Sequence, residues 1–348
     1  MVKKNKFKKI LSNSWVKAFL IAVLIVWLTK TFLIELTIVR DQKMENTLFK
    51  GDVVIINKLC PGPRMPITLI SLPFFGNQFP FTTTPSYLNW IELPYLRINI
   101  KNIQRNDIIA FNYPIENDPP IDKKTVLLKR CIGLPGDTIN IHDKKIFVNN
   151  SLFPDKPTFK YRYRISSNEP LDSTFFNRYR IKEYYYIAKP NIYDVYISNV
   201  TADSIAKDSN VKKVQLLKIL NMPKFTKIFP YSPNFSWSLD YFGTLIIPQK
   251  GKIVKLDAKN IYFYKDIIEK YEQNSFSIEN DTNFIINGII TKQYQFKYNY
   301  YFVLDDNRDL PKDSRYWGFL PETHIIGKAT IILFNLDSES NRSLKKIE

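Results

Sequence analysis

The sequence predicts a mainly β fold with one N-terminal membrane helix, and three observations support this prediction. A long apolar segment at residues 15–39 follows a basic N-terminus. Beyond it, short runs rich in Val, Ile, Phe and Tyr alternate with Gly, Pro, Asn and Asp, as strands alternate with turns. Helical spacing of apolar residues is confined to one or two segments. The 348 residues suffice for one large or two modest domains.

The apolar segment at 15–39 predicts an uncleaved transmembrane signal anchor. It provides roughly 20 residues, the length that crosses a bilayer. The basic N-terminus, residues 1–14, begins MVKKNKFKK, with five lysines and no acid. The positive-inside rule therefore places residues 1–14 in the cytoplasm and exports the rest of the chain. A cleaved signal peptide is the alternative, but no small-residue cleavage site follows the segment.

The exported part divides into a core and two insertions. Residues 40–150 and 244–335 carry the strand-like runs of the core. Residues 60–101 contain seven prolines among aromatic residues, which favours an extended loop insertion. Residues 151–243 are polar and tyrosine-rich and form the second insertion, in which 201–220 has helical character. Residues 336–348 form a polar tail.

Local patterns predict individual elements of the core. Residues 126–133 form a continuous apolar strand, and 138–150 form a hairpin with its turn near Asp143 and Lys144. Residues 244–256 are strand-like around a Lys-Gly turn. Residues 260–272 place Ile and Tyr side chains on one helical face, with Asn260 as the N-cap.

Composition argues against several classes of site. Two cysteines, far apart, provide no disulfide framework, and two histidines in unrelated contexts argue against zinc or a Ser-His-Asp triad. We therefore expect no metal and no cofactor. The formal net charge of +17 fits a surface that attracts anionic lipid or nucleic acid. An AT-rich genome would produce the same bias towards Lys and Asn.

Three short stretches follow the anchor in a fixed order: KMENTLFKGD at 43–52, LLKRCIGLPGD at 127–137 and LDDNRDLPKDSRYWGFLP at 304–321. Together they resemble bacterial signal peptidase I, a family of membrane-bound endopeptidases that use a serine/lysine dyad to remove signal peptides. The resemblance covers the anchor, 35–58, 103–150 and 244–333, and leaves out 60–101 and most of 151–243. It implies a signal-peptidase-like β-barrel or β-sheet catalytic core.

The resemblance implies that Lys129, in the second stretch, is the general base. A lysine with its ordinary pKa of about 10.4 is protonated at neutral pH and is a poor base. Apolar neighbours along 126–132 would desolvate the amine and lower its pKa towards a useful range. An edge-strand lysine that faces water is the alternative.

The nucleophile position departs from the family pattern. The serine of the family's Ser-Met motif is replaced here by Lys43, before Met44, and the hydroxyl position that assists the oxyanion is Asp41. Attack by an amine would form an amide as hard to hydrolyse as the substrate. Two facing lysines would also lower each other's pKa. The usual mechanism therefore lacks its nucleophile in this sequence.

The third stretch resembles the family segment that supports the base. Asp306 with Arg130 or Arg315, or Asp313 with Arg315, would form partly buried charge pairs. The family's leading glycine is Asp305 here, and the serine expected to hydrogen-bond the base is Pro311. A solvated charged loop is the alternative. The positions that match the family are Asp306, Asn307, Arg308, Asp313, Ser314, Arg315, Trp317 and Gly318.

The resemblance implies that a precursor pairs along strand edges, with Met44, Ile132 and the strand after Gly51 as candidates for that groove. The leading hypothesis is a single-pass endopeptidase of the bacterial inner membrane, with its C-terminal part outside the cytoplasm. Its partners would be secretory precursors and the lipid bilayer, with no nucleic acid. Because of Lys43, an inactive relative that binds precursors or a membrane partner is the alternative. A third hypothesis, a tethered protein that binds anionic lipid or nucleic acid, depends on net charge.

Overall fold

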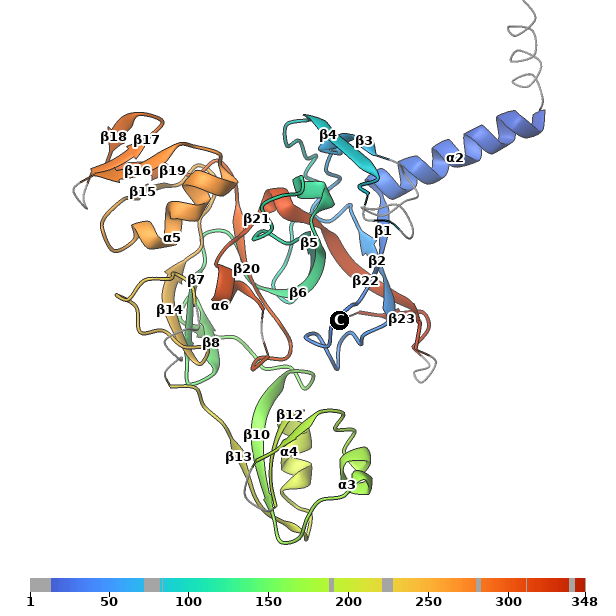
Figure 1. The fold of residues 1–348 in the computed structure, drawn as a ribbon, viewed down its shortest axis with the longest axis vertical. Helices are drawn as coiled ribbons and strands as arrows, with labels where there is room; N and C mark the ends of the chain where they lie inside the picture. The colour runs from blue at the N-terminus through green and yellow to red at the C-terminus, as the bar shows by residue number, and fades with distance from the viewer. Residues whose placement is uncertain are drawn as a thin grey trace, which may run out of the picture.

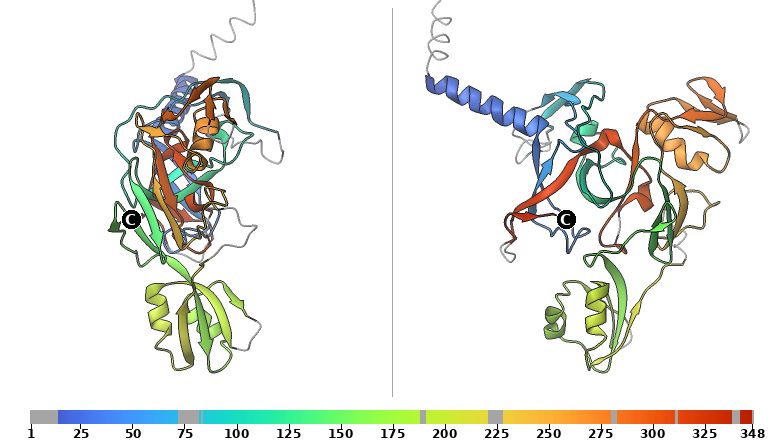
Figure 2. Two further views of the ribbon diagram at one scale, coloured as in Figure 1. Left: turned by 90° about the vertical axis from the view of Figure 1, so that its left-hand side faces the viewer. Right: turned by 180° about the vertical axis from the view of Figure 1, so that it is seen from behind.

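The structure, a computed structural model, describes residues 14–71, 82, 84–187, 191–220, 228–279, 283–310, 312–337 and 342–347. The body is mainly β, as predicted (Figure 1). One long helix, α2 (Ser14–Phe32), projects from the body and has no buried side chain (Figures 1 and 2). It is long and apolar enough to cross a membrane.

The membrane helix is shorter than the predicted 15–39. Residues Ile34–Ile38 form strand β1, which pairs antiparallel with β2 (Asp52–Asn57). The sequence IELTI alternates apolar and polar residues, which suits a strand with one covered face. The chain therefore passes from the helix into the sheet within two residues.

The central sheet carries the candidate site. Its strand order is β1-β2-β22-β5-β6-β20-β21, and β23 pairs with β22. Strand β6 lies between β5 and β20 and is buried from Leu128 onward, which explains its nearly continuous apolar sequence. The bounds are β5 (Ile108–Asn112), β6 (Val126–Gly133), β20 (Tyr300–Leu304), β21 (Leu320–Pro321), β22 (Ile325–Asn335) and β23 (Lys345–Lys346).

A second sheet, β14-β7-β8-β9, packs within the largest apolar cluster. The hairpin predicted at 138–150 is confirmed as β7 and β8, and Asp143 and Lys144 at its turn have φ of 54° and 66°. The predicted strand character of 244–256 is confirmed only at its two ends, because β14 ends at Ile246 and β15 begins at Ile253. These two strands do not pair with each other: β14 pairs with β7 and β15 pairs with β19. The bounds are β7 (Thr138–His142), β8 (Lys145–Val148), β9 (Ser151–Leu152), β14 (Tyr241–Ile246), β15 (Ile253–Lys255) and β19 (Gln293–Gln295).

The helix predicted over 260–272 is confirmed as α5 (Ile261–Asp266) followed by the π-helical turn η2 (Ile267–Tyr271). Asn260 occupies the N-cap position, but its side chain caps no helical N–H group. Its Oδ1 instead accepts the N–H of Asp257 at 2.9 Å. Nearby, β16 (Phe276–Glu279), β17 (Asn283–Ile286) and β18 (Ile289–Thr291) form a three-stranded sheet.

The segment 151–243 contains a separate four-stranded sheet, β11-β12-β10-β13, which packs on two helices (Figures 1 and 2). The prediction of helix for 201–220 is wrong beyond Ile205, because Val211–Leu216 pairs with β10. Tertiary pairing overrides helical propensity there. The bounds are β10 (Lys160–Ser167), α3 (Ser173–Arg178), β11 (Tyr184–Tyr186), β12 (Ile192–Ser198), α4 (Asn199–Ile205) and β13 (Val211–Leu216).

The proline-rich insertion 60–101 is more regular than predicted. It contains an antiparallel pair of strands, β3 (Thr68–Ser71) and β4 (Tyr87–Glu92). The remaining elements are short: η1 (Ile121–Lys123), α6 (Ser314–Trp317) and η3 (Glu322–His324).

Candidate active site

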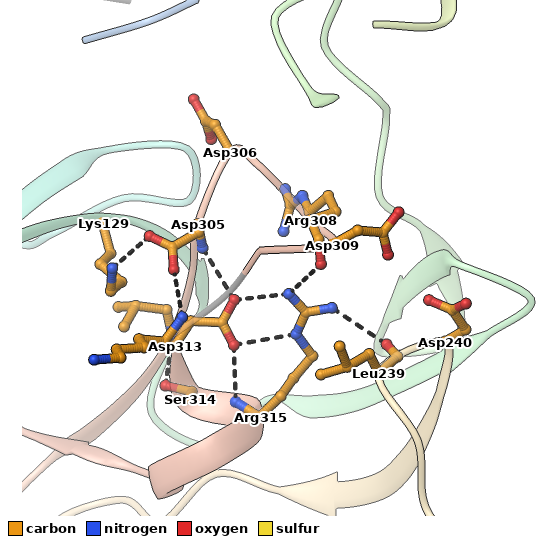
Figure 3. A network of polar contacts seen from close by, with 12 residues as sticks. Lys129, Leu239, Asp240, Asp305, Asp306, Arg308, Asp309, Asp313, Ser314 and Arg315 are labelled. Carbon is orange, nitrogen blue, oxygen red and sulfur yellow. Dashed lines mark hydrogen bonds and ion pairs between the residues drawn. The ribbon is translucent and has the colours of Figure 1, made fainter. Parts of the chain in front are cut away.

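The buried amine of Lys129 lies at the centre of the site. Strand β6 presents it between β5 and β20, with Lys129 opposite Ile109 in the ladder. Its side chain is 1% exposed and forms an ion pair with Asp305, which is 0% exposed (Figure 3). Asp305 follows the last residue of β20. No role was predicted for Asp305, so its pairing with Lys129 is a finding of the structure.

Both oxygens of the Asp305 carboxylate are occupied. One accepts from the Lys129 ammonium group, and the other accepts the N–H of Lys312 at 2.9 Å. Burial raises the pKa of Asp305 to about 6, although the charge of Lys129 opposes that rise. Asp305 is therefore ionised at neutral pH and the pair carries both charges.

The expected fall in the pKa of Lys129 is not found. Burial acts to lower this pKa, but the carboxylates of Asp305 and Asp41 outweigh it and raise the pKa above its ordinary value. The apolar neighbours on β6 alone would lower this pKa, but the two carboxylates come from other segments of the chain and are not apparent in the sequence around Lys129. Lys129 is therefore desolvated and charged.

Lys43 lies in the turn between β1 and β2. Its carbonyl accepts the N–H of Asn307 at 2.8 Å, which ties this turn to the loop after β20. Its own N–H donates to Asp41 Oδ1 at 3.1 Å. The Lys43 side chain is 23% exposed, and its Nζ lies 4.0 Å from Asp41 Oδ2. Burial, followed by the charge of Lys129, lowers the pKa of Lys43.

A cavity of about 330 Å³ opens at Lys43. The wall of this cavity is formed by the segment before β2, the loop after β20 and the second insertion, residues 151–243. Glu183, which comes from the inserted domain, had no sequence signal that placed it here. The lining residues are Arg40, Asp41, Gln42, Lys43, Lys50, Glu183, Asn307 and Leu310.

Two residues predicted for the precursor groove face the interior instead. Met44 is 1% exposed and packs in the apolar cluster beneath β2, while its Sδ accepts the N–H of Asp306 at 3.4 Å. Ile132 is 0% exposed and belongs to the largest core cluster. Both side chains therefore help to build the scaffold rather than the wall of the cavity. Strand β2 also has no free edge, because β1 and β22 pair with its two sides.

Two expected charge pairs are present and both are buried. Arg130 contacts Asp306 through Nε at 2.8 Å and Nη2 at 2.7 Å, and Thr47 Oγ1 donates to the same carboxylate at 2.6 Å. Arg315 contacts Asp313 through Nε at 3.1 Å and Nη2 at 2.8 Å (Figure 3). Bidentate contacts of this kind fix both position and orientation.

The remaining predicted support residues also lie in this network. The hydroxyl of Ser314 accepts the N–H of Val303 at 3.0 Å, and Arg308 stacks 4.1 Å from the ring centroid of Phe159. Arg315 Nη2 additionally donates to the carbonyl of Arg308 at 2.8 Å. The loop that carries Asp305 is therefore held at several points. Pro311 lies outside the described residues.

Comparison with known proteins assigns the family. A family model described as signal peptidase, peptidase S26, matches residues 12–214 and 246–334. The chain belongs to this family. The matched ranges include Lys43, Lys129 and the loop from Asp305 to Arg315.

Similar proteins named signal peptidase I match most of the chain. One from Buchnera aphidicola subsp. Baizongia pistaciae is 28% identical, over 92% of this chain and 76% of its own length. Another, from Buchnera aphidicola subsp. Acyrthosiphon pisum, is 24% identical over 98% of this chain and 80% of its own length. A third, from Haemophilus influenzae, is 23% identical over 91% and 68%.

Proposed function

We propose that this chain is a membrane-anchored signal peptidase that removes signal peptides from exported precursor proteins. The observation that carries the proposal is the convergence of three distant stretches. The Lys43 turn, the Lys129 strand and the Asp305–Arg315 loop meet beside one cavity. The family match covers all three.

The anchor sets the place of action. The positive N-terminus stays in the cytoplasm, α2 crosses the inner membrane and the body lies outside. Helix α2 ends at Phe32 and β1 begins at Ile34, so the central sheet starts next to the membrane surface. A signal peptide that spans the same bilayer would end at this level, which brings its cleavage site to the body.

The precursor binds as an extended chain. Strand β1 is at one edge of the central sheet, and among the described residues no further strand pairs with its outer side. The chain continues from β1 to Arg40, Asp41 and Lys43 in the cavity wall. A peptide added along β1 would therefore lead its scissile bond towards the cavity.

The test uses the full chain in detergent micelles and a purified precursor with a signal peptide. We expect the precursor to shorten at the end of its signal peptide, as shown by gel mobility and N-terminal sequencing. A matched precursor with Trp in place of the small residue before the cut should remain intact. An intact original precursor would refute the proposal.

The alternative of an inactive relative rests on Lys43, which cannot form a hydrolysable acyl intermediate. The cleavage assay separates the two functions directly. Precursor bound by the chain but recovered at full length would favour the inactive binder.

Orientation is tested by adding protease to spheroplasts, which should digest the body and leave the N-terminus protected.

A further inference from the structure

The two lysines of the site differ in their access to the cavity. Lys129 Nζ is enclosed, and its partner Asp305 has both oxygens engaged. An ammonium group that is 1% exposed and paired cannot take a proton from water in the cavity. Lys43, in contrast, lines the cavity itself.

The Lys43 amine is poorly paired. Within the described part of the chain it has one loose ion pair, at 4.0 Å from an Asp41 carboxylate that is 43% exposed, and its Nζ makes no hydrogen bond. Its lone pair, once the amine is neutral, would be available to a molecule in the cavity.

Burial of the Lys43 side chain favours its neutral form, while the charges around it act in both directions. The ammonium groups of Lys129 and Lys312 act against protonation, while Asp305 and Asp41 favour it, and burial is the largest influence. The net effect lowers the pKa of Lys43. The other charged groups of the cavity wall are Arg40, Lys50 and Glu183.

We propose that Lys43 is the general base of this site and that Lys129, locked to Asp305, is a positioning residue. The inference rests on the proposed peptidase function and reassigns the proton acceptor within it. It needs no covalent intermediate, so the absence of a hydroxyl at position 43 is not an obstacle.

The reaction balances with water as the only co-reactant. Neutral Lys43 Nζ takes one proton from a water molecule, whose oxygen forms a bond to the scissile carbonyl carbon. The carbonyl oxygen becomes an oxyanion. The carbon–nitrogen bond then breaks as the Lys43 ammonium returns the proton to the leaving nitrogen. The first products are a carboxylic acid and a neutral amine, and the proton of the acid then passes to the new amine, which leaves a carboxylate and an ammonium group.

The first test does not depend on activity. The full chain in micelles is labelled with acetic anhydride between pH 6 and 11, and each lysine is followed by peptide mass spectrometry. We expect the labelling of Lys43 to reach half its maximum at a lower pH than that of exposed Lys145. Lys129 should remain unlabelled until the protein unfolds. A midpoint for Lys43 at or above that of Lys145, or native labelling of Lys129, would overturn the inference whatever the activity.

The second test is cleavage of the precursor by matched variants. Lys43→Met removes the amine and Lys43→Arg keeps a charge that cannot act as a base, so both should lose about 100-fold or more in kcat/KM. Lys129→Met combined with Asp305→Asn removes both charges of the buried pair and should lose much less.

The outcomes separate the two proposals. If the unsubstituted chain cleaves and Lys43→Met cleaves equally well, the assignment of Lys43 is wrong while the peptidase function stands. The same holds if the Lys129→Met/Asp305→Asn variant is as inactive as Lys43→Met but folds normally by circular dichroism. If the unsubstituted chain does not cleave, the peptidase function fails and the catalytic role of Lys43 fails with it.

Discussion

Removal of Lys129 alone should destabilise the protein severely, and addition of a second substitution should reverse most of the loss. Lys129→Met deletes the ammonium group and keeps an apolar side chain of similar length. Asp305, which is 0% exposed, then retains the N–H of Lys312 as its closest donor. A buried carboxylate without its counter-charge is costly.

The expected magnitude follows from burial. Loss of one partner from a buried pair typically costs about 3–5 kcal/mol, whereas replacement of both partners costs far less. We therefore expect Lys129→Met to lower the free energy of unfolding by about 3–5 kcal/mol, and the addition of Asp305→Asn to restore more than half of that loss. The exposed pair of Lys270 and Asp266 is the matched control, with side chains 53% and 36% exposed. Lys270→Met should cost about 0.5 kcal/mol or less.

The assay is urea unfolding of the full chain in micelles, followed by near-ultraviolet circular dichroism. The destabilisation in Lys129→Met should also shrink as pH falls. The charge of Lys129 opposes the rise in the pKa of Asp305, so removal of Lys129 lets that pKa rise further. The native state of the variant then takes up a proton before its unfolded state does, and lower pH recovers part of the loss relative to the unsubstituted chain. A cost below about 1 kcal/mol, or no recovery in the double variant, would refute the reasoning.

Three further predictions concern stability and use the same unfolding assay. Thr47→Val removes the 2.6 Å hydrogen bond from Thr47 Oγ1 to Asp306 and should lower the free energy of unfolding by about 1.5–3 kcal/mol. Thr47→Ser keeps the hydroxyl and should retain most of that stability. Equal losses in the two variants would contradict a stabilising role of this hydrogen bond. Gly318→Ala should also destabilise, because φ is 87° and a Cβ would lie 2.6 Å from Phe229; a neutral effect would mean that the turn relaxes. Burial holds the pKa of His324 well below its ordinary value. Below about pH 6.5 the unfolded state therefore binds more protons than the native state, and the free energy of unfolding decreases as the pH is lowered. His324→Phe should flatten that fall, and an unchanged slope would exclude His324 as its source.

Much of the fold could be predicted from local pattern. The hairpin at 138–150 follows from apolar alternation around Asp143 and Lys144. The pair of Arg315 with Asp313 likewise joins two residues of one short charged segment. In each case, short segments contain the information.

The parts that sequence missed depend on contacts between distant segments. Asp305 pairs with Lys129 because β20 lies beside β6, and no local pattern states that register. Met44 and Ile132 are apolar residues next to polar motif positions, so the sequence does not distinguish a groove wall from a core. Residues 211–216 form a strand because β10 lies alongside.

The central claim is that Lys43, and not Lys129, is the amine that loses its proton first. The most direct measurement is an NMR titration of the full chain in micelles with ¹³C-labelled lysine, in which Lys43→Arg and Lys129→Arg assign the two signals. We predict a pKa for Lys43 below the ordinary value of about 10.4 and a pKa for Lys129 above it. The opposite order would contradict the account.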